Sequence, residues 1–210
     1  MNAALPARRG KPAATPATPA RPVKPHGGAG EVRIVGGQWK RTPLPVPDLP
    51  GLRPTPARVR ETLFNWLGQD LTGWRCIDAF AGTGALGLEC ASRGATRVLL
   101  CEQEPRLVAG LKALCGRLGA TAVEIQRTDG IAALRGAPAA WDLILLDPPF
   151  DAGLFDAALK AAASALAPSG RVYLEAPETW TAERLAALGW EAERHLRAGV
   201  VHAHLLRRSA

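Results

Sequence analysis

The stretch RCIDAFAGTGALGLECA, residues 75–91, decides the fold because it joins a short apolar run to a helix-like run through glycines. Gly82, Gly84 and Gly87 satisfy the pattern GxGxxG directly after the apolar run. Glycine permits a tight turn and a close backbone approach, and a helix N-terminus presents unpaired N–H groups to an anion. We therefore predict a strand, a ligand-binding loop and a helix, the opening unit of a doubly wound sheet.

Apolar runs and helical stretches alternate on the C-terminal side of this loop. The predicted strands cover residues 75–80, 97–102, 123–127, 141–147 and 171–175. The predicted helices begin near Gly84, Pro105, Gly130, Ala152 and Thr181. Repeated strand-then-helix units predict an α/β fold with a mostly parallel sheet in residues 71–210. Two further strands, 190–196 and 200–206, flank Gly199 and predict an antiparallel terminal hairpin, which brings the sheet to seven strands.

A small extension is predicted in residues 31–70, before the sheet begins. A strand that alternates Val32 and Ile34 with polar residues breaks at Gly36-Gly37, which predicts a hairpin. After a proline-rich connector, Thr55 is the expected N-cap of a helix that ends at Gly68. Its apolar stripe should pack on the main domain, and consists of Val59, Leu63, Trp66 and Leu67.

The formal charge of +7 is distributed unevenly along the chain. Residues 1–30 carry five basic and no acidic side chains, and they are rich in Pro and Ala with almost no large apolar residue. We predict that this basic tail is disordered. Residues 31–75 carry seven basic and four acidic side chains, whereas residues 76–210 have a net charge of −1. A surface that binds a polyanion is therefore expected in the N-terminal third.

Composition restricts the class of protein. With 47% hydrophobic residues and no apolar run of membrane-spanning length, the chain is expected to be a soluble, cytoplasmic protein. Its four cysteines contain no CxxC pair, so neither a zinc site nor a disulfide framework is expected, and Cys76 and Cys101 should be buried free thiols. A monomer is the default expectation.

Asp78 separates the ligands that a glycine loop can bind. Its carboxylate at the strand end would repel a pyrophosphate but attract an ammonium group, while the loop N–H groups suit a carboxylate. S-adenosylmethionine carries an α-ammonium and an α-carboxylate together. We therefore predict that this compound binds at Asp78, Ala81, Gly82, Thr83 and Gly84.

Further acids follow successive predicted strands. Glu102 occupies the position where doubly wound nucleotide-binding folds place an acid on ribose hydroxyls, which NAD and S-adenosylmethionine share. Asp129, followed by Gly130, is suited to accept a hydrogen bond from an adenine amino group. Asp147 ends the next strand. Because ligands bind outside the carboxyl ends of such strands, these acids predict one nucleoside-binding edge.

Four stretches in order carry a resemblance to a known family: VRIVGGQWKRTPL (32–44), RPTPARVRETLFNWL (53–67), DAFAGTGALGLECASRGA (78–95) and LDPPFDAGLF (146–155). Together they resemble the RsmD family, bacterial 16S rRNA guanine-N2 methyltransferases, over residues 31–207. The resemblance implies a Rossmann-like class I methyltransferase fold, S-adenosylmethionine as methyl donor, and 16S rRNA, within a small ribosomal subunit or an assembly particle, as partner.

Asp147-Pro148-Pro149-Phe150 resembles the [DNS]PP[YF] signature of enzymes that methylate exocyclic amines of nucleobases. Such an amine is a poor nucleophile because its lone pair is delocalised into the ring. The carboxylate of Asp147 and the carbonyl of Pro148 are predicted to accept both of its N–H bonds, while Phe150 stacks on the base. No metal is required. Either Asp147 or water can take the proton that the product loses.

In the resembled family the N-terminal extension is implicated in recognising the ribosomal substrate, and the charge of this region agrees. The predicted RNA-binding residues are Arg33, Trp39, Lys40, Arg41, Arg53, Arg58 and Arg60. Trp39 is expected to be exposed in the hairpin, whereas Trp66, Trp74 and Trp141 are expected in the core.

Other functions remain open at this point. Adenine-N6 methylation of DNA or RNA uses the same tetrapeptide chemistry, whereas peptide-glutamine methyltransferases usually show Asn-Pro-Pro-Tyr. A non-catalytic ribosome assembly factor with the same fold is the alternative from a different class. An NAD-dependent dehydrogenase is disfavoured by Asp78 and by the lack of a catalytic His or Tyr near the predicted site.

Overall fold

The computed structural model describes Met1 and residues 30–209. The predicted disordered tail therefore lies outside the described residues, apart from its first and last positions. No helix in the described part of the chain is long and apolar enough to cross a membrane.

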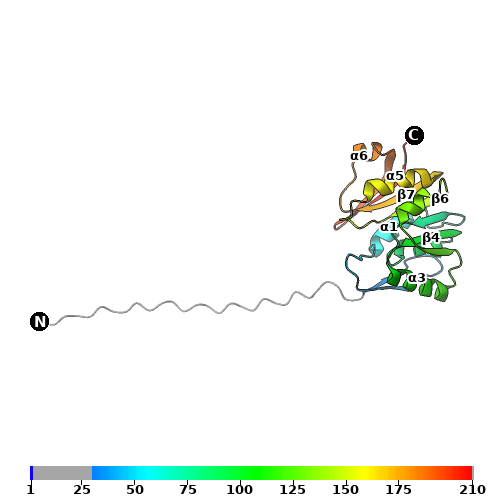
Figure 1. Cartoon of the computed structure of the whole chain (residues 1–210), viewed down its shortest axis with the longest axis horizontal. Helices are drawn as coiled ribbons and strands as arrows, with labels where there is room; N and C mark the ends of the chain where they lie inside the picture. Colours follow the sequence, from blue (N-terminus) through cyan, green and yellow to red (C-terminus); the bar gives the residue numbers. More distant parts are fainter. Residues whose placement is uncertain (2–29, 210) are drawn as a thin grey trace.

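A seven-stranded sheet forms the centre of the fold, in the order β5-β4-β3-β6-β7-β9-β8 (Figure 1). Its strands are β3 (Arg75–Asp78), β4 (Arg97–Glu102), β5 (Val123–Arg127), β6 (Trp141–Leu146), β7 (Leu166–Ala176), β8 (Trp190–Ala198) and β9 (Val201–Arg208). Strands β3 to β7 pair in parallel, while β9 is antiparallel to both β7 and β8. The predicted α/β sheet with an antiparallel terminal hairpin is confirmed.

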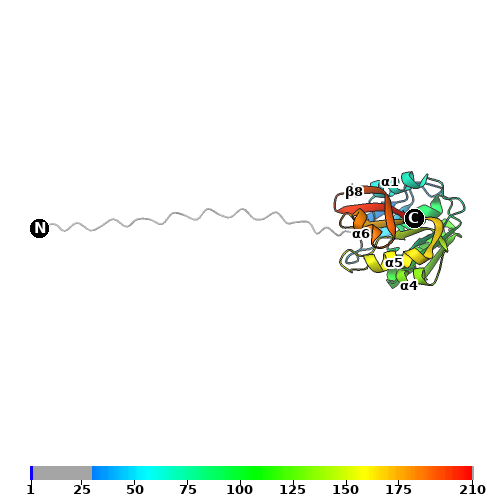
Figure 2. The same cartoon turned by 90° about the horizontal axis from the view of Figure 1, so that it is seen from above.

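Helices cover both faces of the sheet, so the core has two halves; α1 and α5 lie on opposite sides (Figure 2). Successive strand residues alternate between the halves: Cys76 and Leu143 belong to one, Ile77 and Ile144 to the other. The first half contains residues of α1 (Ala57–Leu67), α2 (Ala85–Ser92) and α3 (Pro105–Leu118). The second contains residues of α4 (Gly130–Arg135), α5 (Phe155–Ala165) and α6 (Ala182–Ala186).

Most predicted boundaries agree with the structure, with two differences. Strand β7 begins at Leu166, five residues before the predicted start at 171, because Leu166 pairs with Trp141 ahead of an irregularity in the register. The helix predicted near Ala152 begins at Phe155 instead. Gly153 has a φ of 64°, so the chain turns once more before the helix starts.

The N-terminal extension contains a hairpin of β1 (Gly30–Arg33) and β2 (Pro43–Val46), paired antiparallel. Strand β2 lies within the proline-rich stretch that the sequence analysis predicted to be a connector without regular structure. The prediction of Thr55 as N-cap is wrong, because Pro56 occupies that position and no side chain caps α1. The hydroxyl of Thr55 donates instead to the carboxylate of Asp147, at 3.5 Å.

The loop of the hairpin packs closely on α2. Ser92 donates its hydroxyl to the carbonyl of Gly36 (2.6 Å) and accepts the N–H of Trp39 (2.9 Å). The N–H of Val35 donates to Glu89 (2.5 Å). Gly37 has a φ of 72°, and a Cβ there would lie 1.9 Å from the carbonyl oxygen of Ser92. The extension is therefore fixed to the helix that follows the glycine loop.

Candidate active site

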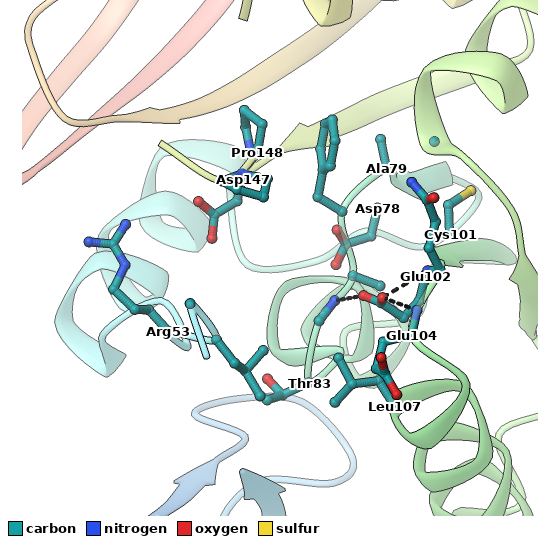
Figure 3. Close-up of a pocket in the computed structure, with 18 of the residues that line it drawn as sticks. Arg53, Asp78, Ala79, Thr83, Cys101, Glu102, Glu104, Leu107, Asp147 and Pro148 are labelled. Atoms are coloured by element: carbon teal, nitrogen blue, oxygen red, sulfur yellow. Dashed lines mark hydrogen bonds between the residues drawn. The ribbon is translucent and has the colours of Figure 1, made fainter. Parts of the chain in front are cut away.

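A cavity of about 750 Å³ opens where β3, β4 and β6 end (Figure 3). The ends of these strands contribute Asp78, Glu102 and the Asp147 tetrapeptide, and residues 49–55 of the N-terminal extension form another part of the wall. This volume is in the range of pockets that bind small molecules and cofactors. The predicted edge of the sheet is therefore a real cavity, and the extension helps to build it.

The glycine loop has the geometry that its sequence indicated. Gly82 and Gly84 have φ values of 52° and 79°, which a side chain rarely adopts, and the N–H of Gly84 donates to the carbonyl of Ala81 (2.6 Å). Gly84 is also the N-cap of α2. Gly87 allows close packing, because a Cβ there would lie 2.2 Å from Leu100 and 3.1 Å from the Cβ of Asp78.

Asp78 is buried at the end of β3, with 1% of its surface exposed, and it lines the cavity. Its Oδ2 accepts the N–H of Gly87 at 3.0 Å, while its Oδ1 is buried without a hydrogen-bond partner among the described residues. Burial raises the pKa of Asp78 to about 7, although the backbone N–H groups of Gly87 and Phe80 oppose this. A buried acceptor with one unused oxygen is suited to a cationic donor from a ligand.

Glu102 is held differently. One carboxylate oxygen accepts the N–H of Gly82 (2.8 Å), and the other accepts those of Gln103 (2.7 Å) and Glu104 (2.8 Å). The N–H of Gly82 is therefore directed to Glu102 in this structure. The glutamate lines the cavity and fixes the glycine loop at the same time.

The remaining predicted cofactor residues divide into two groups. Ala81, Thr83 and Gly130 line the cavity, whereas Gly84 and Asp129 are not among the residues that line it. Asp129 is exposed, and its Oδ1 caps α4 by accepting the N–H groups of Ile131 (2.7 Å) and Ala132 (3.1 Å). The structure thus gives Asp129 a capping role that its position after a strand did not reveal.

Asp147-Pro148-Pro149-Phe150 lies across the cavity from the glycine loop, and all four residues line it. Pro148 is buried, and Phe150 is half-buried. The guanidinium of Arg53 lies over the ring of Phe150, 4.0 Å from its centroid. One aromatic ring at the cavity is thus available for planar stacking and already carries a planar cation.

Two residues next to Asp147 were missed by the sequence analysis. The hydroxyl of Thr55 donates to Oδ2 of Asp147 (3.5 Å), and Glu175 on β7 is a second buried carboxylate nearby. Burial raises the pKa of Asp147 well above its usual value, and the charges of Glu175 and Asp78 raise it further. Glu175 also follows a predicted strand, and this signal could have revealed it; the role of Thr55 depends on tertiary contacts.

The predicted RNA-binding residues do not form one uniform set. Arg33, Lys40, Arg41 and Arg58 are exposed on the extension, and Arg53 is exposed where it lines the cavity. The cationic side chains of the extension therefore reach from the hairpin to the cavity wall.

Two of these predictions need correction. Arg60 is buried, with 1% of its surface exposed, and donates to Glu89 (2.7 Å) and to the carbonyls of Arg33 (2.9 Å) and Thr55 (3.1 Å). It therefore fixes the extension and has no surface for RNA. Trp39 is only partly exposed, because it packs against the hydrophobic core. Trp141 is fully buried as predicted, while Trp66 and Trp74 are partly buried against the core.

Comparisons with known proteins agree with this geometry. A sequence-family model described as "Conserved hypothetical protein 95" matches residues 32–207. "Ribosomal RNA small subunit methyltransferase D" of Escherichia coli is 38% identical over 191 residues, covering 88% of this chain and 94% of the relative. The protein of the same name from Haemophilus influenzae is 36% identical, covering 72% and 86%. The solved structure of a putative methyltransferase from Escherichia coli has a TM-score of 0.73 and 34% identity, covering 86% of this chain and 99% of that one.

Proposed function

We propose that this chain, which belongs to the RsmD family, transfers a methyl group from S-adenosylmethionine to the exocyclic N2 amine of a guanine in 16S rRNA. The relatives named above are ribosomal RNA small subunit methyltransferases. One observation carries the proposal: Asp78 beside the glycine loop and the Asp147 tetrapeptide line the same cavity. An acceptor for a cationic ligand and an acceptor for an amine are thereby brought together.

The residues of the cavity fit S-adenosylmethionine. The unpartnered Oδ1 of Asp78 matches an α-ammonium group, which would supply the hydrogen bond that this buried atom lacks. Glu102 retains lone pairs for ribose hydroxyls while it holds the loop. Ala81, Thr83 and Gly130 complete the predicted contacts. When bound, the cofactor supplies an electrophilic methyl group on a sulfonium.

The tetrapeptide is suited to orient an amine. An Asp147 carboxylate oxygen and the carbonyl of Pro148 are fixed acceptors, because prolines limit the freedom of the backbone here. Two accepted hydrogen bonds hold the nitrogen with its lone pair directed at the cofactor. Phe150 stacks on the guanine after the base has left its neighbours, at the position where Arg53 lies in this structure.

The extension is proposed to hold the RNA. Lys40 and Arg41 on the hairpin loop and Arg58 on α1 are exposed cations, and residues 49–55 carry this surface to the cavity. Phosphate contacts of this kind position an RNA without reading its sequence. Because so small an extension offers few contacts, we propose that the substrate is a ribosomal particle rather than free RNA.

The test is transfer of labelled methyl from S-adenosylmethionine to small ribosomal subunits from a strain that lacks this gene. Labelled N2-methylguanosine is expected after nucleoside analysis, and Asp147→Asn should reduce its formation by about 10³-fold. Asp156→Asn, an exposed aspartate on α5, is the matched control and should retain activity. Labelled N6-methyladenosine instead would overturn the guanine assignment while leaving the fold and the chemistry in place.

A non-catalytic assembly factor would behave differently. It would bind the ribosomal particle, but calorimetry would detect no binding of S-adenosylmethionine to the wild type. A methyltransferase, in contrast, would bind S-adenosylmethionine and lose this binding in Asp78→Ala. The buried, unpartnered oxygen of Asp78 argues against this alternative, because it costs folding free energy and a decayed site would have no reason to keep it.

A further inference from the structure

A buried carboxylate, that of Glu175, lies beside the partly exposed Asp147. In the register of the parallel strands β6 and β7, Leu145 is opposite Tyr173 and Leu146 is opposite Leu174, which places Asp147 next to Glu175. Glu175 is 2% exposed and is not among the described residues that line the cavity. It accepts the hydroxyl of Tyr173 at 2.9 Å. This glutamate is thus outside the reach of the substrate but adjacent to the predicted catalytic acid.

A single hydroxyl connects the two carboxylates. Thr55 donates to Oδ2 of Asp147 (3.5 Å), and its hydroxyl also lies close enough to Glu175 to lower the pKa of that acid as well as that of Asp147. One hydroxyl has one hydrogen and cannot donate to both carboxylates at once. If both acids were ionised, one buried carboxylate would lose this donor. A proton on Glu175 removes the conflict, because the acid then donates to Thr55 while Thr55 donates to Asp147.

We propose that Asp147 and Glu175 share one proton across Thr55, with Glu175 holding it, so that Asp147 stays an ionised acceptor for the substrate amine. In this arrangement Tyr173, Glu175 and Thr55 form a row in which every hydrogen bond donates toward Asp147. Glu175 and Thr55 are positioning residues, since they act through Asp147. The inference rests on the proposed function only for the identity of the amine.

The surrounding charges agree with one shared proton. The charges that act on the pair come from Asp78 on β3 and Arg53 in the wall segment, and Tyr173 on β7 contributes its hydroxyl. Among the described residues, Arg53 is the one cation whose charge acts on Asp147 and Glu175, and its side chain is exposed. Burial raises the pKa of both Asp147 and Glu175, as expected for two acids in one site, of which one retains its proton.

The proton balance follows directly. Once the amine nitrogen has gained a methyl group it carries one proton in excess. The N–H bond breaks, its electron pair stays on nitrogen, and the proton passes to Asp147. The pair then holds two protons and is neutral, and it returns one to water when the product leaves. No oxidant, reductant or further reactant is needed.

The first test uses the ligand-free full chain and does not depend on activity. Infrared spectroscopy at neutral pH separates the carbonyl stretch of a protonated carboxylic acid from that of a carboxylate. The wild type should show a protonated-acid band that Glu175→Gln removes and that Asp147→Asn retains. Comparison of variants isolates Glu175 from Asp78, which also titrates near this pH. A band unchanged by Glu175→Gln would overturn the proposal.

The second test compares Glu175→Gln with Glu175→Leu in methyl transfer. Glutamine, like a protonated glutamate, donates to Thr55, whereas leucine does not. We expect kcat for Glu175→Gln near that of the wild type and kcat for Glu175→Leu lower by about tenfold or more, with KM unchanged. If both variants are equally slow, Glu175 acts as an ionised base; if both are fast, it has no role. Either outcome would reject a shared proton.

Thr55→Ser and Thr55→Val provide an independent pair if substitutions at Glu175 impair folding. Serine keeps the hydroxyl and should retain kcat, whereas valine, of nearly the same shape, should lose about tenfold. Equal rates for the two would contradict the proposal. Failure of the proposed function is recognised separately, since the wild type would then transfer no methyl group, yet the infrared band would still report on the pair.

Discussion

Two groups of buried charge in this protein are built in opposite ways. Behind the hairpin, Glu89 is paired with two arginines, Arg60 at 2.7 Å and Arg93 at 3.4 Å. Around the cavity, Arg53 is the one cation among the described residues whose charge acts on Asp147 and Glu175, and one oxygen of Asp78 has no hydrogen-bond partner among them. The first group has its counter-charges inside the protein and joins two parts of the fold, although Oε2 of Glu89 also lacks a hydrogen-bond partner among the described residues and burial raises the pKa of Glu89. The second leaves negative charge that a cationic ligand and an amine would complete.

The comparison predicts that neutral substitutions have opposite effects on stability in the two groups. Glu89→Gln keeps the shape of the side chain but leaves two buried guanidiniums without their counter-ion. We expect a loss of about 3–5 kcal/mol in the free energy of unfolding, measured with urea. Glu124→Gln removes the exposed ion pair with Arg97 (3.4 Å) and should cost at most about 1 kcal/mol. Equal losses in the two variants would show that the buried Glu89 cluster contributes no more to the free energy of unfolding than an exposed ion pair does.

Asp78→Asn should act in the other direction. Burial raises the pKa of Asp78 from 3.8 to about 7, so its contribution to stability is fully present below about pH 3.8 and is lost progressively as the pH rises from there through about 7. The shift, 7 minus 3.8, is about 3 units, which sets an upper limit of about 4 kcal/mol of destabilisation at alkaline pH. Asparagine removes this charge, so the variant should be more stable at about pH 8 by about 1–4 kcal/mol.

The gain in Asp78→Asn should be smaller near pH 5, where the aspartate is protonated in the folded protein but still ionised in the unfolded chain, and it should vanish only below about pH 3.8. It should come with a loss of S-adenosylmethionine affinity of about a hundredfold. Urea unfolding at both pH values and calorimetry measure the two effects. Asp156→Asn is the control for loss of one surface charge. A variant that is less stable than the wild type at pH 8 would mean that the Gly87 bond, rather than burial, dominates at this site.

The hairpin carries exposed charge, so substitutions there should weaken the affinity for RNA and leave the affinity for S-adenosylmethionine unchanged. Lys40→Glu with Arg41→Glu reverses two exposed cations and should weaken binding of the ribosomal substrate by about tenfold or more at physiological salt. The matched control is Lys112→Glu with Arg117→Glu on α3, which changes the charge equally. Parallel loss of cofactor affinity would indicate misfolding, and equal loss in the control would show only long-range attraction.

The same contrast explains what the sequence could predict. The alternation of strands and helices, the glycine loop and the carboxylates at strand ends follow from local patterns, so the sequence predicted Asp78, Glu102 and Asp147 at one edge of the sheet, where all three line the cavity. Arg58 and Arg60 look alike in sequence, yet one is exposed and the other buried. The helical spacing held a signal, because Arg60 lies three residues before Leu63 and seven before Leu67, on the apolar stripe.

Other features depend on partners far away in the chain. Thr55 looks like an N-cap because of its residue type, and only the packing of the extension beside β6 reveals that its hydroxyl reaches a residue 92 positions away. Asp129 shows the reverse situation. Its place after a strand predicted a ligand contact, whereas the helix that begins at Gly130 gives its Oδ1 local donors. A polar side chain forms hydrogen bonds with the groups that lie closest to it in space. Partners that are far away in the sequence cannot be located without the fold.

A substitution of Arg53 should have the smallest effect. In the described part of the chain, Arg53 is the one cation whose charge acts on Asp147 and Glu175. Its charge lowers the pKa of both Asp147 and Glu175, and its guanidinium lies on Phe150. Arg53→Ala should therefore raise both pKa values further, so the acid limb of the kcat profile moves to higher pH. The shift should be small, less than about one unit, because the side chain is exposed and screened by solvent. Arg53→Lys keeps the charge and should restore the acid limb, while any change in KM from lost stacking on Phe150 should persist. An acid limb that moves equally in both variants would assign the effect to the planar contact and remove Arg53 from the electrostatics of the site.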